Sequence, residues 1–94
     1  MLVLVIYDIS EDDARQKIAN ILLQYGFKRI QRSAYIGKIP SHILKELELK
    51  LKKLMKTAHG NIQIFKLTPQ QYKNRIEIGH REEPLLDSEL EIIT

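Results

Sequence analysis

LVLVIYD, residues 2–8, is the most informative stretch of this chain: a continuous apolar run, rich in β-branched side chains, that stops at Asp8. Such a run is typical of a central β-strand buried on both faces. Ser10 and Asp13 then match a capping box at the start of a helix. These patterns predict a strand–helix unit over residues 2–26, with Gly26 as the helix stop. The apolar face of the helix has the expected spacing and comprises Ala14, Ile18, Ile21, Leu22 and Tyr25.

The segment FKRIQRSAYI, residues 27–36, alternates loosely between apolar and polar residues. This alternation predicts a half-buried strand with basic residues on its accessible face. Residues 27–39 are long enough for either one bent strand or a hairpin, and residues 37–40 read as a turn. Ser41 is the expected cap of a second helix that runs to about Lys56, with its leucines on one side except Leu49, which lies among the lysines of the other.

The segment IQIFKL, residues 62–67, predicts a third clear strand, and IEI at residues 76–78 predicts a short late one. The resulting order is typical of an α+β, ferredoxin-like βαββαβ sandwich, in which two helices cover one face of an antiparallel sheet. The other face of the sheet is then open, and a second copy of the chain is the simplest cover for it. We therefore expect a homodimer in which the C-terminal strand extends the partner's sheet edge.

Length and composition exclude several classes of protein. The chain has 94 residues, which fits one domain, and its lack of cysteine excludes a disulfide framework, a thiolate nucleophile and a Cys–zinc site. No apolar run reaches the roughly 18 residues of a membrane span. The N-terminus lacks the basic region of a signal peptide. We therefore expect a soluble, cytoplasmic protein with no membrane partner.

The net charge of +3 is unevenly divided along the chain. Residues 1–80, the expected ferredoxin-like domain, hold 14 Lys+Arg and 7 Asp+Glu, a net charge of +7. Residues 81–94 hold one arginine and five acidic residues, a net charge of −4. The basic domain suits a phosphate backbone. The acidic C-terminal tail would cover a sheet edge, mask the basic surface or dock a basic protein partner.

Asp8 is the main candidate for chemistry, because it ends the first strand where a rigid backbone fixes the side chain and its tip meets solvent. A carboxylate there can bind a hard cation. One aspartate is a poor magnesium site, since Mg²⁺ takes about six oxygen ligands, but two copies of Asp8 facing each other across a two-fold axis supply two carboxylates. The alternative is that Asp8 ends the strand and accepts hydrogen bonds from the turn.

Basic residues gather around the first helix and the second strand, with two tyrosines expected nearby. Basic groups interleaved with aromatic rings suit phosphate contact and base stacking, although a solvated basic face has the same pattern. The lysines between residues 45 and 56 form a second basic surface, read as an ordinary solvent face. The histidines and serines show no metal-ligand spacing and no nucleophile elbow. The basic residues around the first helix and the second strand are Arg15, Lys17, Lys28, Arg29 and Arg32, and the two tyrosines expected near them are Tyr7 and Tyr35.

Three segments together resemble the second core CRISPR-associated protein family, the partner of the CRISPR integrase in spacer acquisition. They are VIYDIS at 5–10, YGFKRIQRSAYIG at 25–37 and NIQIFKLT at 61–68. The resemblance covers residues 1 to about 80. It implies a ferredoxin-like homodimer and a Mg²⁺-dependent endonuclease acting on single-stranded RNA or double-stranded DNA, with Asp8 as metal ligand and catalytic residue.

By the same resemblance, several side chains fall where the family has residues that affect activity: Tyr7, Arg15, Arg29 and Tyr35, with Lys17 at a further basic position and Ser33 near the dimer centre. We add Arg32 to the nucleic-acid-binding set. The competing interpretation is a non-catalytic dimeric scaffold that binds duplex DNA and bridges the CRISPR integrase. A third is a ferredoxin-like RNA-binding protein or ribonuclease outside CRISPR.

Overall fold

The computed structural model describes residues 1–80, so the acidic tail predicted for residues 81–94 lies outside the described part. The elements are β1 (Leu2–Ile9), α1 (Asp12–Gln24), β2 (Lys28–Gln31), β3 (Ala34–Lys38), α2 (Ser41–Leu54), β4 (Gly60–Leu67) and α3 (Pro69–Lys73). The four strands form one antiparallel sheet in the order β2-β3-β1-β4. This order and connectivity confirm the ferredoxin-like prediction.

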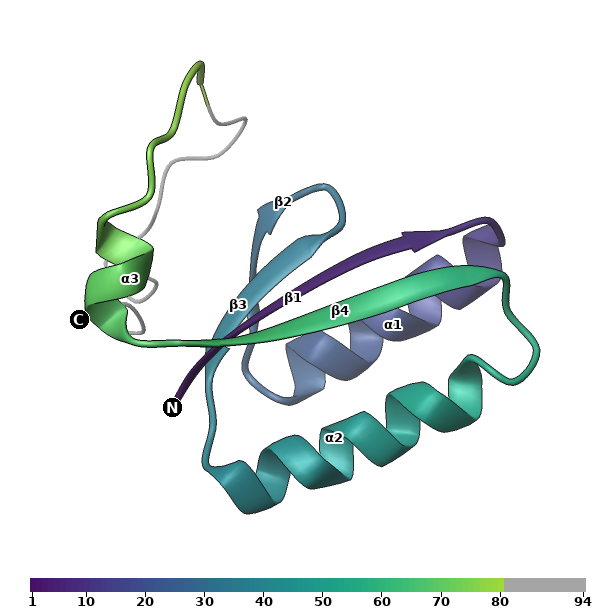
Figure 1. Ribbon diagram of the computed structural model, residues 1–94. Helices are drawn as coiled ribbons and strands as arrows, with labels where there is room; N and C mark the ends of the chain where they lie inside the picture. The colour runs from purple at the N-terminus through teal and green to yellow at the C-terminus, as the bar shows by residue number, and fades with distance from the viewer. Residues whose placement is uncertain (81–94) are drawn as a thin grey trace.

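The two faces of the sheet are covered differently, as Figure 1 shows, with α1 and α2 side by side beneath one face. Val3, Val5 and Tyr7 point to this face and join the main core. Leu4 and Ile6 point to the other face and are only partly buried. The prediction that the first strand is buried on both faces is therefore wrong for its second half, because α3 covers only one end of the open face.

The predicted cap of the first helix is wrong. Helix α1 begins at Asp12 with Glu11 as its N-cap residue, and no side chain caps it, so the Ser10–Asp13 capping box does not form. The helix is held instead by its buried face of Ala14, Ile18 and Leu22. Gly26, at a φ of 84°, ends this segment as predicted.

The second helix also differs at both ends from its prediction. Pro40, not Ser41, is the N-cap residue of α2, and Ser41 is already helical. The helix ends at Leu54, about two residues earlier than predicted. Its buried face consists of Leu44, Leu47 and Leu51, which pack on the main core.

Residues 28–38 form a hairpin, which decides between the two alternatives for this segment. The pairing of β2 with β3 is irregular between Arg29 and Gln31. Gly37 is not in a turn, as expected, but within β3, where the Phe27 ring lies so close that an added Cβ would approach its carbons to 2.6 Å. Tyr35 is buried rather than accessible, while its pairing partner Arg29 is exposed.

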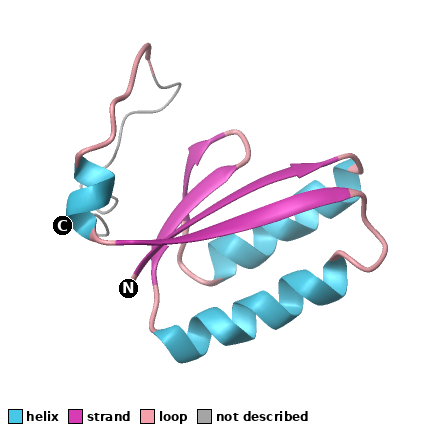
Figure 2. Ribbon diagram, viewed as in Figure 1, coloured by secondary structure: helices cyan, strands magenta, loops and turns pink. Residues whose placement is uncertain are grey.

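A short helix, α3, follows β4 and was not predicted (Figure 2). Thr68 and Gln71 cap it reciprocally, each side chain bonding the other residue's backbone N–H. The helix places Tyr72 on the open face, against Leu2 and Ile36. Residues 76–78 do not form the predicted late strand. Among the described residues, no helix is long and apolar enough to cross a lipid bilayer.

Candidate functional site

Asp8 is an exposed carboxylate on the open face of the sheet. It lies next to the last residue of β1, and its pairing partner across the strands is Asn61 at the start of β4. Paired residues in an antiparallel sheet point to the same face, so the Asn61 amide shares this surface with the carboxylate. Residues 1–80 contain no group of three acidic or histidine side chains arranged to hold a metal ion. One protomer therefore supplies one carboxylate and one amide here.

A basic pocket lies on the opposite face of the sheet, between α1 and the β2–β3 hairpin. Its floor is the stacked pair of Tyr7 and Tyr35, whose ring centroids are 6.2 Å apart with an angle of 17° between the planes. The backbone N–H of Tyr7 donates to the Ser33 carbonyl at 3.0 Å, which fixes the strand end against the hairpin turn. The lining residues are Tyr7, Asp12, Arg15, Gln16, Ala19, Leu23, Arg29, Arg32, Ser33 and Tyr35.

The structure thus brings together five of the six residues predicted to bind nucleic acid, and Ser33 with them. Lys17 is exposed on α1 but does not line the pocket, and neither does Lys28. Asp8 is on the other side of the sheet, because consecutive side chains of a strand alternate between its faces. The predicted metal ligand and the predicted phosphate contacts therefore form two separate sites.

The Tyr7 hydroxyl is held in its neutral form. Burial raises the pKa of Tyr7 to about 12, and the neighbouring Tyr35 adds to the increase, while the positive charges of Arg29 and Arg15 oppose it. At neutral pH the Tyr7 ring is accordingly an uncharged aromatic surface beneath arginines. Such a surface suits stacking and phosphate contact together.

The three arginines of the pocket are in different environments. Nη1 of Arg15 donates to the carbonyl oxygens of Ile9 at 2.8 Å and Ser10 at 3.3 Å, and Nη2 pairs with the Asp12 carboxylate. Within residues 1–80, no carboxylate forms a salt bridge with Arg29 or Arg32. Arg29 and Arg32 are therefore the arginines of the pocket that remain available to a bound anion.

A contact between Glu11 and His59, which no sequence pattern indicated, joins the start of α1 to the residue before β4. The Glu11 carboxylate accepts hydrogen bonds from the His59 backbone N–H at 2.9 Å and from Nδ1 at 2.6 Å. These hydrogen bonds lower the pKa of the Glu11 carboxyl. Forty-eight residues separate the two side chains, so no local pattern could show that they meet.

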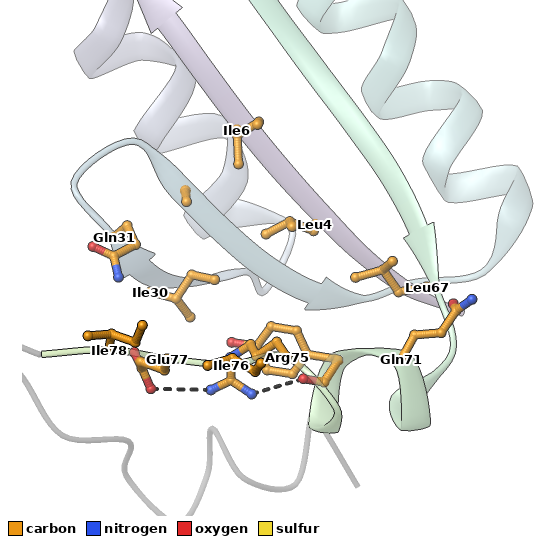
Figure 3. Close-up of a pocket in the computed structure, with 12 residues that line it drawn as sticks. Leu4, Ile6, Ile30, Gln31, Leu67, Gln71, Arg75, Ile76, Glu77 and Ile78 are labelled. Atoms are coloured by element: carbon orange, nitrogen blue, oxygen red, sulfur yellow. Dashed lines mark hydrogen bonds and ion pairs between the residues drawn. The ribbon is translucent and has the colours of Figure 1, made fainter.

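The open face is hollowed at the end opposite Asp8 (Figure 3). Leu4, Ile6 and Ile30 form the floor of the hollow, and α3 with the chain that follows it forms one wall. Arg75 lies over the Tyr72 ring, 4.0 Å from its centre, and pairs with Glu77 at 3.6 Å. Ile76 and Ile78 are 87% and 93% exposed, so apolar surface at this end of the sheet remains in contact with water.

The second predicted basic surface lies on α2 and the residues just after it. Lys45, Lys50, Lys52, Lys53 and Lys56 are all exposed, which agrees with an ordinary solvent face. Leu49 stands among them with 68% of its surface exposed. One such leucine is normal on a protein surface.

The strand order, the arginine pocket on one sheet face and the exposed carboxylate on the other define a small ferredoxin-like protein with two separate polar sites. The chain belongs to the family described as CRISPR associated protein Cas2, whose family model matches residues 1–75. This match confirms the family resemblance of the sequence.

Relatives and a solved structure agree with this assignment. The chain is 44% identical to "CRISPR-associated endoribonuclease Cas2 2" of Pyrobaculum aerophilum, over 84% of this chain and 87% of the relative. It is 43% identical to a "CRISPR-associated endonuclease Cas1/endonuclease Cas2 fusion" of Thermoproteus tenax, over 86% of this chain but only 31% of that longer protein. The crystal structure of Streptococcus pyogenes Cas2 has the same fold, with a TM-score of 0.70 at 20% identity, covering 84% of this chain and all of that one.

Proposed function

We propose that this protein is an endonuclease of CRISPR spacer acquisition that works in the cytoplasm and cleaves phosphodiester bonds of RNA or double-stranded DNA with the help of Mg²⁺. Membership of the Cas2 family supports the proposal, as do the names of its relatives as endoribonuclease and endonuclease. The observation that carries it is the position of Asp8, an exposed carboxylate held at the end of a strand on the open face of the sheet.

Asp8 fits Mg²⁺ as part of a shared site. The ion binds proteins through one or two carboxylates and retains several waters. Asp8 supplies one carboxylate beside the Asn61 amide. A second copy packed on the same open face would supply the other Asp8. A bound Mg²⁺ would supply charge that polarises the scissile phosphate and lowers the pKa of a water ligand. Asp8 holds the ion, while Arg29 and Arg32 bind phosphates of the same nucleic acid on the other face of the sheet.

The test is cleavage of RNA and of duplex DNA by Asp8→Asn, with and without Mg²⁺. We expect at least a hundredfold loss of kcat, because the substitution removes the carboxylate charge proposed to hold Mg²⁺. Nucleic-acid binding should be retained, because the proposed phosphate contacts lie on the other face of the sheet. Asp13→Asn is the matched control, since Asp13 is another exposed acid near the start of α1, and it should keep full activity. Unchanged cleavage by a clean preparation of Asp8→Asn would show that the catalytic proposal is wrong.

The alternative function is a dimeric scaffold that binds duplex DNA and bridges the CRISPR integrase. The Thermoproteus tenax relative, whose name joins Cas1 and Cas2 in one chain, supports a Cas1-type partner. The separation of the basic pocket from Asp8 supports binding without cleavage. If Arg29→Gln abolishes duplex binding or integrase capture while Asp8→Asn leaves spacer acquisition intact, the scaffold function is the correct one.

A further inference from the structure

Arg15 is occupied by its own chain. It sits in the first turn of α1, and its Nη1 donates to the carbonyl oxygens of Ile9 and Ser10, at 2.8 and 3.3 Å. Its Nη2 forms an ion pair with Asp12, one turn earlier on the helix. A guanidinium presents its donors in a fixed planar fork, so these contacts set the orientation of the whole group. The fork is directed at the connection between β1 and α1.

This connection directly follows Asp8. Ile9 is buried in the main core with 3% of its surface exposed, so the peptide between Ile9 and Ser10 is fixed by its side chain on one side and by Arg15 on the other. A rigid connection at this point fixes the Asp8 backbone and therefore the position from which the Asp8 side chain extends.

The β4 side of the connection is equally tight. The Ser10 N–H donates to the His59 carbonyl at 2.9 Å, and Glu11 accepts two hydrogen bonds from His59. Gly60 lies so near that an added Cβ would come within 1.9 Å of the Asp8 carbonyl oxygen. The end of β1 is thus held by β4 on one side and by Arg15 on the other. We call the Arg15 hydrogen bonds to the Ile9 and Ser10 carbonyls the Arg15 clamp.

Arg15 is a poor phosphate-binding residue, because its donors are already used within the chain. Asp12 is paired with the guanidinium, and its carboxylate would repel an anion that approached Nη2. Arg29 and Arg32 have no such partner within residues 1–80. Arg15 therefore contacts its own chain, whereas Arg29 and Arg32 are available to a bound phosphate.

We infer that Arg15 is a positioning residue that holds the end of β1 beneath Asp8, and that the phosphate contacts of the pocket come from Arg29 and Arg32. The catalytic part of this inference rests on the proposed nuclease function. The structural part, that Arg15 binds the strand end and not the nucleic acid, stands independently of cleavage.

The decisive experiment compares Arg15→Lys and Arg15→Gln with Arg29→Gln. Binding to a duplex oligonucleotide is measured without Mg²⁺ over a range of salt concentrations, because each phosphate contact contributes about 0.9 to the slope of log K against log salt. Arg29→Gln should reduce the slope by about 1, and both Arg15 variants should leave it unchanged. A slope reduced by Arg15→Gln as much as by Arg29→Gln would overturn the inference.

Cleavage supplies the second readout. Both Arg15 variants should lower kcat about 10- to 100-fold while KM stays within about twofold, since positioning acts on the transition state more than on binding. Lysine should not rescue, because a single ammonium keeps the charge but cannot span two carbonyls and a carboxylate. Full kcat in Arg15→Lys would show that charge alone matters and would overturn the positioning role.

A third readout needs no activity and separates this inference from the nuclease proposal. In NMR spectra, the carbonyl carbons of Ile9 and Ser10 should shift in Arg15→Lys and stay in place in Arg29→Gln. If Asp8→Asn cleaves normally, the nuclease proposal fails, and the salt slope with these carbonyl shifts still decides what Arg15 binds. If Arg15→Gln fails to fold, Arg15→Lys carries all three measurements. Unchanged carbonyl shifts in a folded Arg15→Lys protein contradict the clamp.

Discussion

On the sheet face that α1 and α2 cover, apolar side chains form a continuous core that ends in the Tyr7–Tyr35 pair beneath the pocket arginines. On the opposite face, Leu4 and Ile6 are only partly covered, and Asp8 is exposed. Tyr7 and Asp8 are neighbours in sequence, yet the alternation of a strand sends them to different sides. The proposed phosphate contacts and the proposed metal ligand are therefore separated by the thickness of the sheet. A nucleic acid that contacts both the arginine pocket and Asp8 must pass around an edge of the sheet or contact the Asp8 of another copy of the chain.

The largest expected effect comes from a substitution that damages both faces at once. In Gly60→Ala, the new Cβ would collide with the Asp8 carbonyl oxygen, and the φ of 126° adds strain. The pairing of β1 with β4 cannot tolerate this collision, so the free energy of unfolding should fall by about 3 kcal/mol or more. Chemical denaturation measures the loss.

Gly26→Ala is the matched control for this prediction. Gly26 also has a positive φ, of 84°, but nothing lies within 4 Å of an added Cβ. Only the conformational penalty remains, and it amounts to about 1–2 kcal/mol. Equal losses in the two variants would mean that the close approach of Gly60 to Asp8 is unimportant for stability.

The second prediction tests whether the open face of the sheet, and not the outer surface of α2, is where two copies of the chain associate. Phe65 is 41% exposed on the open face, opposite Leu4, whereas Leu49 is 68% exposed on α2. If a second copy covers the open face, Phe65→Arg places a charge in that interface and should convert dimers to monomers, at least a tenfold rise in the dissociation constant. Leu49→Arg should leave association unchanged. Sedimentation velocity at several concentrations decides, and identical behaviour of both variants would exclude the open face as the dimer surface.

The third prediction concerns the covered face alone. Because the folded pKa of Tyr7, about 12, lies above the ordinary tyrosine value of 10.0, an unfolded chain ionises this group first. Its contribution to stability is therefore complete below pH 10 and is lost as the pH rises from 10 to 12. Tyr7→Phe should lose less free energy of unfolding over this interval than the wild type.

A spectrophotometric titration checks the same assignment directly. The absorbance component of the wild type that titrates at about pH 12 should be missing in Tyr7→Phe. It should remain in Tyr72→Phe, which removes a buried tyrosine from the opposite face. Retention of the component in Tyr7→Phe would show that another group is responsible.

The sequence was sufficient for the parts of the fold that local patterns encode. The apolar run that ends at Asp8 and the leucine spacing of α2 predicted their elements correctly, because each pattern has the period of its structure. Caps were predicted less well. Ser10 is a good capping residue by type, but the chain turns one residue later, where Glu11 is engaged by His59. Helix α3 was missed because five residues are too few to show a period.

The candidate site was predictable as a set of residue types but not as an arrangement. Basic and aromatic residues near α1 and β2 predicted a nucleic-acid-binding set, and the structure places five of its six members around one pocket. The engagement of Arg15 by the Ile9 carbonyl depends on how the helix leaves the strand, which no residue pattern records. For the same reason the sequence could not show that Lys17 does not line the pocket.

The smallest expected effect is at the α3 end of the open face. Thr68→Ala removes the side chain that accepts from the Gln71 N–H and so breaks the capping box, which should cost α3 about 1 kcal/mol. The amide of Tyr72 should then exchange hydrogen roughly five times faster, since about 1 kcal/mol corresponds to a fivefold change in the local opening equilibrium. Thr57→Ala, at another exposed threonine, is the control.

The amides of β1 near Asp8 are the informative comparison in that experiment. They are held by β4 and by the Arg15 clamp, neither of which involves α3. Their exchange rates should therefore stay at wild-type values in Thr68→Ala. Faster exchange at both ends would mean that the open face opens as one unit, and that covering its apolar end also controls the order of the carboxylate end.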